Sequence, residues 1–259
     1  MGMGVVLGGL VVLGCAAPEG DGAVDQAVAA ASNHDFDVDF TGCAEFVGIG
    51  TVPAANARPL VPAHYTLAGD ASDAIIVVRI ASCAGAAVDG HDAVATRVSQ
   101  IGISVTGQDT TADINNYQLW YVTDQGLLNG RFTAEGVDVD VDQHITFAFT
   151  ANSGAGGGGT LAIGTSPPKA PPYQGSGPAA APTAAPVTFV ASWWFDGKKG
   201  IVRSRTVFPA IRFGSATMTL TTPAGSALAQ LIGGTSLTFP LLDSYNTFPA
   251  APMEVRAVP

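Results

Sequence analysis

Side chains that could carry acid–base or metal chemistry are few and widely spaced in this 259-residue sequence. The histidines are four: His34, His64, His91 and His144. No two of them have the HxH or HxxxH spacing that brings two imidazoles to one metal ion. Aspartates alternate with other residues at 35–39 and at 138–142, but the glycine and terminal glutamate of an EF-hand calcium loop are missing. These patterns predict surface or capped histidines and solvated strand faces, and no metal site.

Motifs of nucleophilic catalysis and phosphate binding are also missing. The sequence has no GxSxG elbow, which excludes the serine arrangement of the α/β-hydrolases. Ser226 precedes a short apolar run, so we expect it to cap a helix. The glycine run 156–159 lacks the Lys-Ser/Thr pair of a phosphate-binding loop. The sequence therefore predicts no cofactor.

A group of aromatic and basic side chains is the best candidate for a ligand site. Its members are Tyr117, Trp120, Trp193, Trp194, Arg203 and Arg205. Arg203 and Arg205 are two residues apart, so on a strand they share a face. If that face points inward, the two form an anion clamp beside aromatic walls, which is an ordinary composition for a small-ligand pocket. If it points outward they are solvated, and this alternative is favoured because buried arginine requires a paired charge.

The amino terminus has the features of an export signal. Residues 1–14 carry no charged side chain, and Val5–Leu13 is apolar apart from two glycines. Val12-Leu13-Gly14-Cys15 resembles a bacterial lipobox, whose cysteine is acylated and becomes the mature N-terminus. We expect a signal peptide over 1–14 and a lipid on Cys15, with a simple cleaved signal or a cytoplasmic protein as the alternatives.

Two further cysteines, Cys43 and Cys83, form an even pair that an oxidising compartment would join. A disulfide between them would close a loop of about 40 residues and stabilise the fold by roughly 3–4 kcal/mol. Two buried free thiols are the alternative. A zinc site is not expected there, because neither cysteine belongs to a CxxC pair.

The net charge of −10, with only 12% charged residues, argues against nucleic acid as a partner, because neutralising phosphates needs a basic surface. No stretch after the amino terminus approaches the ~18 apolar residues of a membrane-spanning helix. We therefore expect an extracytoplasmic protein that contacts the membrane through its lipid anchor in the cell envelope, or a secreted one.

The elements that must position these residues are mostly strands. Residues 15–33 are rich in Ala, Gly and acids, which predicts a flexible tether before a single β-rich domain over 34–259. Alternating or continuous apolar residues predict strands over 36–40, 46–52, 74–82, 94–105, 117–122, 145–150, 187–195, 201–208 and 216–221. The Gly- and Pro-rich segment 152–186 is expected to be a surface excursion with a strand only at 160–163.

Helical signals are short. A single turn is expected between Pro53 and Pro62, and helices over 124–134, with Asp124 as N-cap and Gly136 as the stop, and over 226–232. Strands outnumber helices and recur at short spacing. The predicted fold is mainly β, an antiparallel barrel or a double-layer sandwich with one or two short helices; side-chain alternation is the same in both.

Several coarse features resemble the acetoacetate decarboxylase family. They are a β-rich chain of this size, a short helix before Leu60-Val61-Pro62 with a strand after it, and a tryptophan-bearing hairpin late in the chain. In that family adjacent lysines supply a Schiff-base amine, and Lys198-Lys199 is the adjacent pair here. The family's pair lies mid-chain on a pocket-lining segment, whereas Lys198-Lys199 lies in an Asp-Gly-Lys-Lys-Gly turn. The resemblance therefore implies a shared fold without shared decarboxylation.

The chain also looks similar to a family of exported bacterial lipoproteins, in segments such as 113–117 and 209–214. Our main hypothesis is an exported, lipid-anchored β-rich protein that binds a small apolar or anionic ligand against the aromatic and basic group. An acetoacetate decarboxylase-like enzyme and a surface structural protein with no pocket are the alternatives.

Overall fold

The computed structural model describes residues 35–153, 157–198 and 200–258. Contacts divide the chain after Asn33, and the described residues belong to the unit 34–259. The predicted signal peptide (1–14), the tether (15–33) with Cys15, and Lys199 lie outside the described residues and stay predictions. In the described ranges, no helix is long and apolar enough to cross a membrane.

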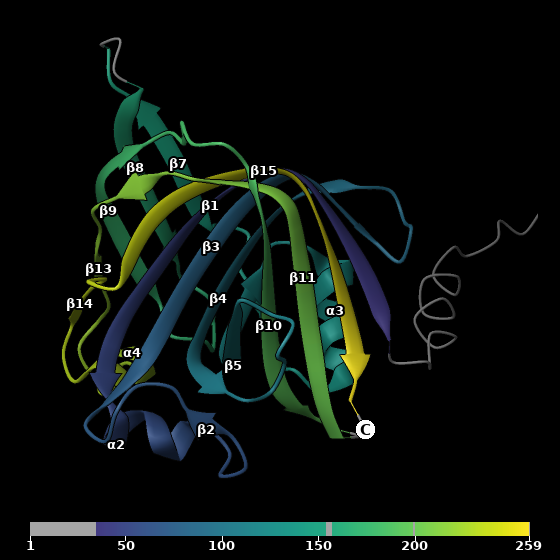
Figure 1. The fold of residues 1–259 in the computed structure, drawn as a ribbon, viewed down its shortest axis with the longest axis vertical. Coiled ribbons are helices and arrows are strands. Elements are labelled where there is room, and N and C mark those ends of the chain that lie inside the picture. Colours follow the sequence, from purple (N-terminus) through teal and green to yellow (C-terminus); the bar gives the residue numbers. More distant parts are fainter. Residues whose placement is uncertain (1–34, 154–156, 199, 259) are drawn as a thin grey trace, which may run out of the picture. The chain divides into compact units, whose positions relative to one another are not determined.

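Seven long strands close a barrel (Figure 1). They are β1 (Phe36–Pro53), β3 (Asp73–Val88), β4 (Val94–Thr106), β5 (Ile114–Thr123), β10 (Val187–Gly197), β11 (Gly200–Phe213) and β15 (Leu242–Ala257). Their order is β4-β3-β1-β15-β11-β10-β5, and β5 pairs with β4 to complete the circle. All of these pairs are antiparallel except β5 with β10. The predicted mainly β fold is confirmed as a closed barrel.

A second sheet covers part of the outside of this barrel. It has the order β14-β13-β9-β8-β7, and β12 pairs with β9. Its strands are β7 (Thr146–Ala151), β8 (Gly158–Thr165), β9 (Tyr173–Ala180), β12 (Ser215–Ala216), β13 (Thr219–Thr221) and β14 (Ser236–Thr238). The short strands β2 (Thr66–Leu67) and β6 (Val139–Val141) extend the barrel sheet beside β4 and β5. The helices are α2 (Ala54–Ala57), η1 (Arg58–Leu60), α3 (Gly126–Glu135) and α4 (Ala227–Ile232).

Two apolar cores hold these layers together. In one, helix α3 buries Phe132 against Phe36 and Tyr121 of the barrel, with ring centroids 5.0 and 4.6 Å apart. The other lies between the barrel and the second sheet, where Phe46 of β1 meets Phe239 at 5.5 Å. Burying each such side chain is worth roughly 1.5–3 kcal/mol. Strand β3 is covered on both faces, which explains the continuous apolar run Ile75–Val78 in the sequence.

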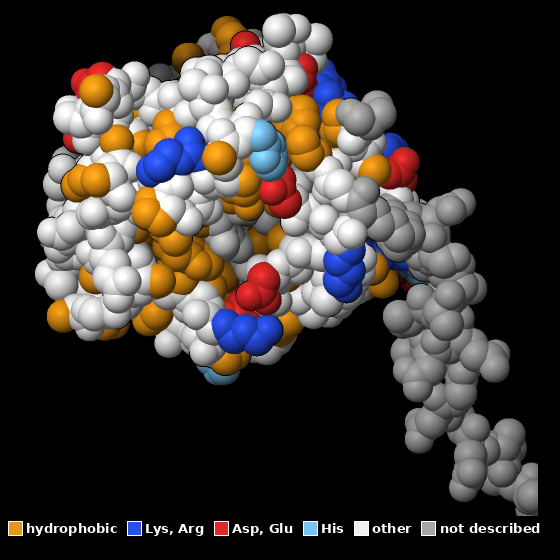
Figure 2. All heavy atoms as spheres, turned by 90° about the horizontal axis from the view of Figure 1, so that it is seen from below, with side chains coloured by type: hydrophobic (Ala, Val, Ile, Leu, Met, Phe, Trp, Pro, Cys, Tyr) orange, Lys and Arg blue, Asp and Glu red, His pale blue; other side chains and the backbone are white. Residues whose placement is uncertain are grey.

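The surface carries little charge. Figure 2 shows the face that is turned downward in Figure 1. Its charged side chains form a few small groups scattered among uncharged atoms, and hydrophobic side chains gather in a hollow. This distribution fits a sequence with only 12% charged residues.

The predicted disulfide is present. Cys43 on β1 is bonded to Cys83 on β3, directly opposite it in the strand register, and both side chains belong to the core that includes α3. The bridge therefore ties two neighbouring barrel strands.

Several local predictions differ from the structure. The strands expected at 36–40 and 46–52 are one strand, β1, which contains Gly42 at φ 58°. Helix α3 begins two residues later than expected, because Asp124 accepts a hydrogen bond from the backbone N–H of Arg97 at 2.7 Å instead of capping. Gly136 ends α3 as predicted. Ser226 caps α4 through the N–H of Ala229 at 3.0 Å, also as predicted.

The segment 152–186 is more regular than expected, because β8 and β9 are central strands of the second sheet. Its glycines serve close packing between strands: a Cβ at Gly175 would lie 2.9 Å from the sulfur of Met218. Small residues thus allowed a tight sheet where the composition indicated a loop.

The aspartates at 138–142 were also misread as a solvated strand face. Asp140 is buried and accepts hydrogen bonds from the backbone N–H groups of Lys169 and Ala170, at 2.7 and 2.6 Å. Asp142 is buried as well and accepts from the N–H of Ser166 at 2.6 Å. These carboxylates anchor the loop between β8 and β9.

Candidate functional site

A charged pair lies inside the barrel. Glu45 on β1 and Arg79 on β3 join carboxylate Oε2 to guanidinium Nε at 2.7 Å, and their side chains are only 4% and 12% exposed. The register places Glu45 opposite Ala81 and Arg79 opposite Val47, so the two are diagonal neighbours on the inner face of adjacent strands. Two opposite charges in such a setting must compensate each other, because either one alone would be a buried unpaired ion.

Polar side chains from three more strands complete the network. Arg79 donates from Nη1 to Gln100 Oε1 at 2.7 Å, and Gln100 donates from Nε2 to Gln118 Oε1 at 3.2 Å. Asn246 donates from Nδ2 to Glu45 Oε1 at 3.2 Å. Because the guanidinium only donates and the carboxylate only accepts, the charged pair decides which way each amide faces. Gln118 Nε2 and Asn246 Oδ1 are left over, buried and without a hydrogen-bond partner in the described part of the chain.

Asn116 adds a third unpartnered group. Its Oδ1 accepts from Ser104 Oγ at 2.8 Å, while its Nδ2 has no hydrogen-bond partner among the described residues. The whole residue is 1% exposed. Buried polar groups are nearly always paired, so unmatched ones beside a cavity indicate a place where another molecule completes the hydrogen bonds.

The cavity next to these groups has a volume of about 50 Å³. Its lining comes from six of the seven barrel strands, with Glu45, Arg79, Asn116 and Asn246 as the polar part. The apolar walls are Val47, Ile49, Val77, Ile114, Phe189, Ala191, Trp193, Phe208, Ile211, Phe213 and Leu242. Arg79 also lies over the ring of Phe208, with 5.9 Å from the guanidinium carbon to the centroid. Mostly apolar walls with a few polar side chains are the composition of a small-molecule site.

Of the six side chains predicted to bind a ligand, Trp193 alone lines this cavity. Trp194 points to the other face of β10, where its indole N–H donates to Asn115 Oδ1 at 2.9 Å. Arg203 and Arg205 also point outward, toward Asp109 Oδ2 at 3.3 and 3.7 Å. The arginines therefore do not form an anion clamp inside the barrel.

The carboxylate of Asp109 pairs with Arg203 and Arg205 on the outside of the barrel. Burial on its own raises the pKa of Asp109, but hydrogen bonds from Thr111 and Ser192 and the charge of Arg203 outweigh it and hold the pKa below its ordinary value. Asp109 is therefore ionised at neutral pH and neutralises the arginines that the sequence offered as anion ligands.

Tyr117 and Trp120 lie on the outside of β5. The ring of Tyr117 packs on that of Tyr65, with centroids 4.9 Å apart. Burial, with a smaller contribution from the charge of Asp196, raises the pKa of Tyr117, so its phenol stays protonated at neutral pH. Trp120 lines a separate pocket of about 120 Å³ with Leu119 and Lys169.

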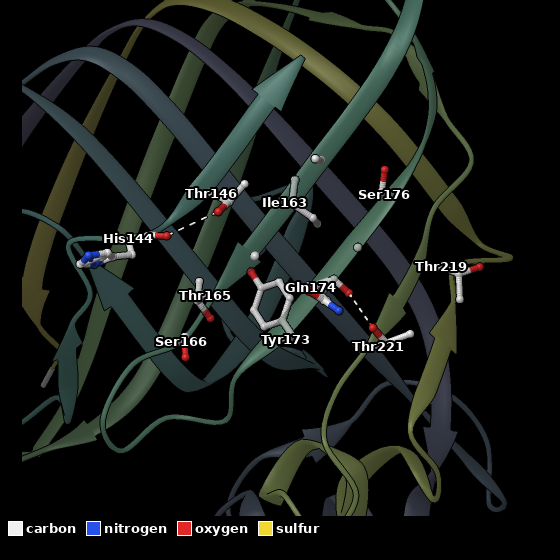
Figure 3. Close-up of a pocket in the computed structure, with 13 residues that line it drawn as sticks. His144, Thr146, Ile163, Thr165, Ser166, Tyr173, Gln174, Ser176, Thr219 and Thr221 are labelled. Carbon is white, nitrogen blue, oxygen red and sulfur yellow. Dashed lines mark hydrogen bonds between the residues drawn. The ribbon is translucent and has the colours of Figure 1, made fainter. Parts of the chain in front are cut away.

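A larger hollow, of about 580 Å³, lies along the second sheet (Figure 3). Its lining is mostly small and hydroxylated, with Thr146 on β7, Gln174 on β9 and Thr221 on β13, and His144 at one side. The hydrogen bond drawn between Gln174 and Thr221 runs to a backbone carbonyl. Although this hollow exceeds the barrel cavity in volume, it has neither a charged pair nor an unpartnered buried side chain among its described lining residues. The barrel interior is therefore the stronger candidate.

Sequence reasoning missed Glu45, Arg79 and Asn246. A signal was available: Arg79 interrupts the apolar run of β3, a strand predicted to be buried, and a buried arginine requires an acidic partner. The sequence did not show which of its 21 acidic residues that partner is.

Lysines are absent from the described lining of the cavity. Lys169 is 68% exposed beside Asp138, and Lys198 donates to the carbonyl of Thr133 at 3.1 Å near the β10–β11 hairpin end. Within the described ranges there is also no group of three His, Cys, Asp or Glu side chains able to hold a metal ion.

Comparisons with known proteins identify the fold. No family model matches the sequence, and no curated protein sequence matches it. A structure of acetoacetate decarboxylase is similar over 85% of this chain and 88% of that one, with 11% identity and a TM-score of 0.53. The enduracididine biosynthesis enzyme MppR, complexed with pyruvate, is similar over 85% of this chain and 87% of that one, with 14% identity and a TM-score of 0.52. An acetoacetate decarboxylase-like enzyme from Sphingomonas wittichii RW1 is similar over 85% of this chain and 90% of that one, with 9% identity and a TM-score of 0.50. The predicted acetoacetate decarboxylase-like fold is confirmed.

The Glu45–Arg79 pair gives a stability prediction. Glu45→Met leaves the arginine buried and uncompensated, and should lower the free energy of unfolding by about 3–5 kcal/mol. The double variant Glu45→Met/Arg79→Met removes both charges and should recover most of that loss. Urea denaturation of the single and double variants measures this. Lys169→Met, at an exposed ion pair, is the matched control and should change little. A double variant as unstable as the sum of the two single variants would contradict the prediction.

Proposed function

We propose that this protein binds a small organic molecule inside its β-barrel. The single observation that carries the proposal is the interior cavity, where unpartnered amide groups of Asn116 and Asn246 stand beside a charge-balanced pair and apolar walls. Buried polar groups without partners destabilise a fold by about 1–3 kcal/mol each. A bound molecule that completes these hydrogen bonds would offset that cost and gain apolar contacts as well.

The fold supports a role in small-molecule binding. One structural neighbour was solved as a complex with pyruvate, a small oxo acid, so proteins of this fold include binders of molecules of that size. A surface structural protein with no pocket, the other alternative, would not need a cavity lined by six barrel strands.

Filling the cavity tests the proposal. Ala191→Leu adds three carbon atoms to a wall of the cavity, and should abolish binding of small molecules while changing stability modestly. Ligand-observed NMR with a library of small fragments measures binding to the wild type and the variant. The control is Ala148→Leu, which makes the same change on an exposed position of β7. Equal binding by Ala191→Leu and wild type would place the ligand elsewhere.

An acetoacetate decarboxylase-like enzyme is the second candidate, and the fold likeness favours it. Schiff-base chemistry requires a lysine of depressed pKa within reach of the bound substrate. Lys169 and Lys198 both lie outside the cavity lining. If the chain is an enzyme, its reaction therefore does not run through either of these amines.

Borohydride trapping separates the two candidates. Incubation with acetoacetate and sodium borohydride should leave the protein mass unchanged, because no described lysine faces the cavity. Intact-protein mass spectrometry gives the readout, and acetoacetate decarboxylase itself is the positive control. A reduced adduct mapped by peptide mass spectrometry to one lysine would favour the enzyme.

We further propose that the protein is exported and anchored by a lipid on Cys15. The apolar segment Val5–Leu13 and the following Leu13-Gly14-Cys15 support this. The Cys43–Cys83 disulfide supports it too, since disulfides persist mainly in oxidising compartments. The lipid would hold the barrel at a membrane surface.

Metabolic labelling tests the anchor. When the full chain is expressed in a bacterium fed a radiolabelled fatty acid, the wild type should take up label and fractionate with membranes. Cys15→Ser should lose both properties, while Cys43→Ser keeps the label. Label that persists in Cys15→Ser, or a wild type without label, would reject the anchor.

A further inference from the structure

We propose that the barrel cavity is selective for neutral molecules that carry both a hydrogen-bond donor and an acceptor, such as a short primary amide, and discriminates against carboxylates of the same size. This inference rests on the proposed binding function and specifies its ligand class. It rests on the charge balance of the cavity, on the unpartnered amide atoms of two residues that line it, and on its volume.

The charge balance disfavours an anionic ligand. Glu45 and Arg79 are the only charged residues among the described lining of the cavity, and they neutralise each other at 2.7 Å. The guanidinium also donates to Gln100 at 2.7 Å, which occupies a second of its nitrogens. A carboxylate would therefore bring an uncompensated negative charge next to Glu45, and burying such a charge is strongly unfavourable.

The two free amide atoms define what the ligand must offer. Asn246 turns its Nδ2 to Glu45, so its Oδ1 remains as an acceptor. Asn116 takes the Ser104 hydroxyl on its Oδ1, so its Nδ2 remains as a donor. Both residues line the cavity, and neither is more than 1% exposed. A ligand that supplies one acceptor and one donor satisfies both.

The volume limits the ligand's size. A single water molecule needs about 10–15 Å³ of such volume, so the cavity of about 50 Å³ accommodates roughly three to five non-hydrogen atoms. The apolar walls, including Trp193 and Ala191, suit a short hydrocarbon tail on the polar head group.

Three probes of equal size separate these requirements: propionamide, 2-butanone and propionate. Propionamide donates and accepts, 2-butanone only accepts, and propionate accepts but is charged. Ligand-observed NMR titrations at pH 7 against the disulfide-bonded protein give the dissociation constants. We expect propionamide to bind about tenfold more tightly than propionate, and about threefold to tenfold more tightly than 2-butanone.

Two variants locate the selectivity in named residues. Glu45→Gln removes the negative charge and leaves Arg79 unbalanced, so the preference should reverse and propionate should bind more tightly than propionamide. Asn116→Leu removes the free donor but keeps the charges. It should weaken all three probes by about threefold to tenfold, because each of them would accept from that donor, so the order of the probes should stay as in the wild type. Asp138→Asn, which changes an exposed carboxylate outside the cavity, is the control and should keep the wild-type order.

The outcomes distinguish the inference from the function beneath it. Propionate as the tightest probe of the wild type would overturn the inference and leave small-molecule binding intact. A second result would also overturn the inference and leave the binding function intact: none of the three probes binds, while other fragments bind to the wild type and not to Ala191→Leu. If no fragment binds at all, both the selectivity inference and the proposed binding function are rejected. If Glu45→Gln does not fold, judged by circular dichroism, the Asn116→Leu series decides.

Discussion

Burying a charge inside a β-barrel constrains everything around it, and the Glu45–Arg79 pair has this effect here. The pair spans neighbouring strands β1 and β3, so it depends on their register, which the Cys43–Cys83 bridge ties directly. The guanidinium and the carboxylate then impose an orientation on Gln100, Gln118 and Asn246, because one can only donate and the other only accept. The unpartnered Oδ1 of Asn246 follows from this chain of hydrogen bonds, whereas the unpartnered Nδ2 of Asn116 follows from the hydrogen bond with Ser104.

The rest of the fold buries that network. Helix α3 packs Phe132 into one core of the barrel, and the second sheet covers the outer faces of several barrel strands. Most residues of β3 are buried on both of its faces, so Arg79 lies in a largely apolar strand. The sequence has only 12% charged residues, and the two charged residues in the described lining of the cavity, Glu45 and Arg79, pair with each other.

The likeness to acetoacetate decarboxylase is one of architecture. The barrel and second sheet match proteins of that fold over 85% of the chain. The described lining of the cavity holds a paired Glu and Arg instead of a lysine. A scaffold that admits small molecules can keep its cavity while its reactive group changes, since function resides in the site and not in the fold.

The sequence by itself determined the strand content, the short helices at α2 and α4, the Ser226 cap, the Gly136 stop and the pairing of Cys43 with Cys83. Each of these depends on local periodicity, a cap or elimination among few cysteines, which are readable along the chain. The segment 152–186 was misjudged because its glycines permit close strand packing, a property of neighbours distant in sequence. Only the tertiary structure decided which faces point into the barrel, and so separated Trp193 from Trp194 and turned Arg203 and Arg205 toward Asp109. Strand alternation gives two faces but does not say which one the closed barrel encloses, because that depends on how all seven strands meet.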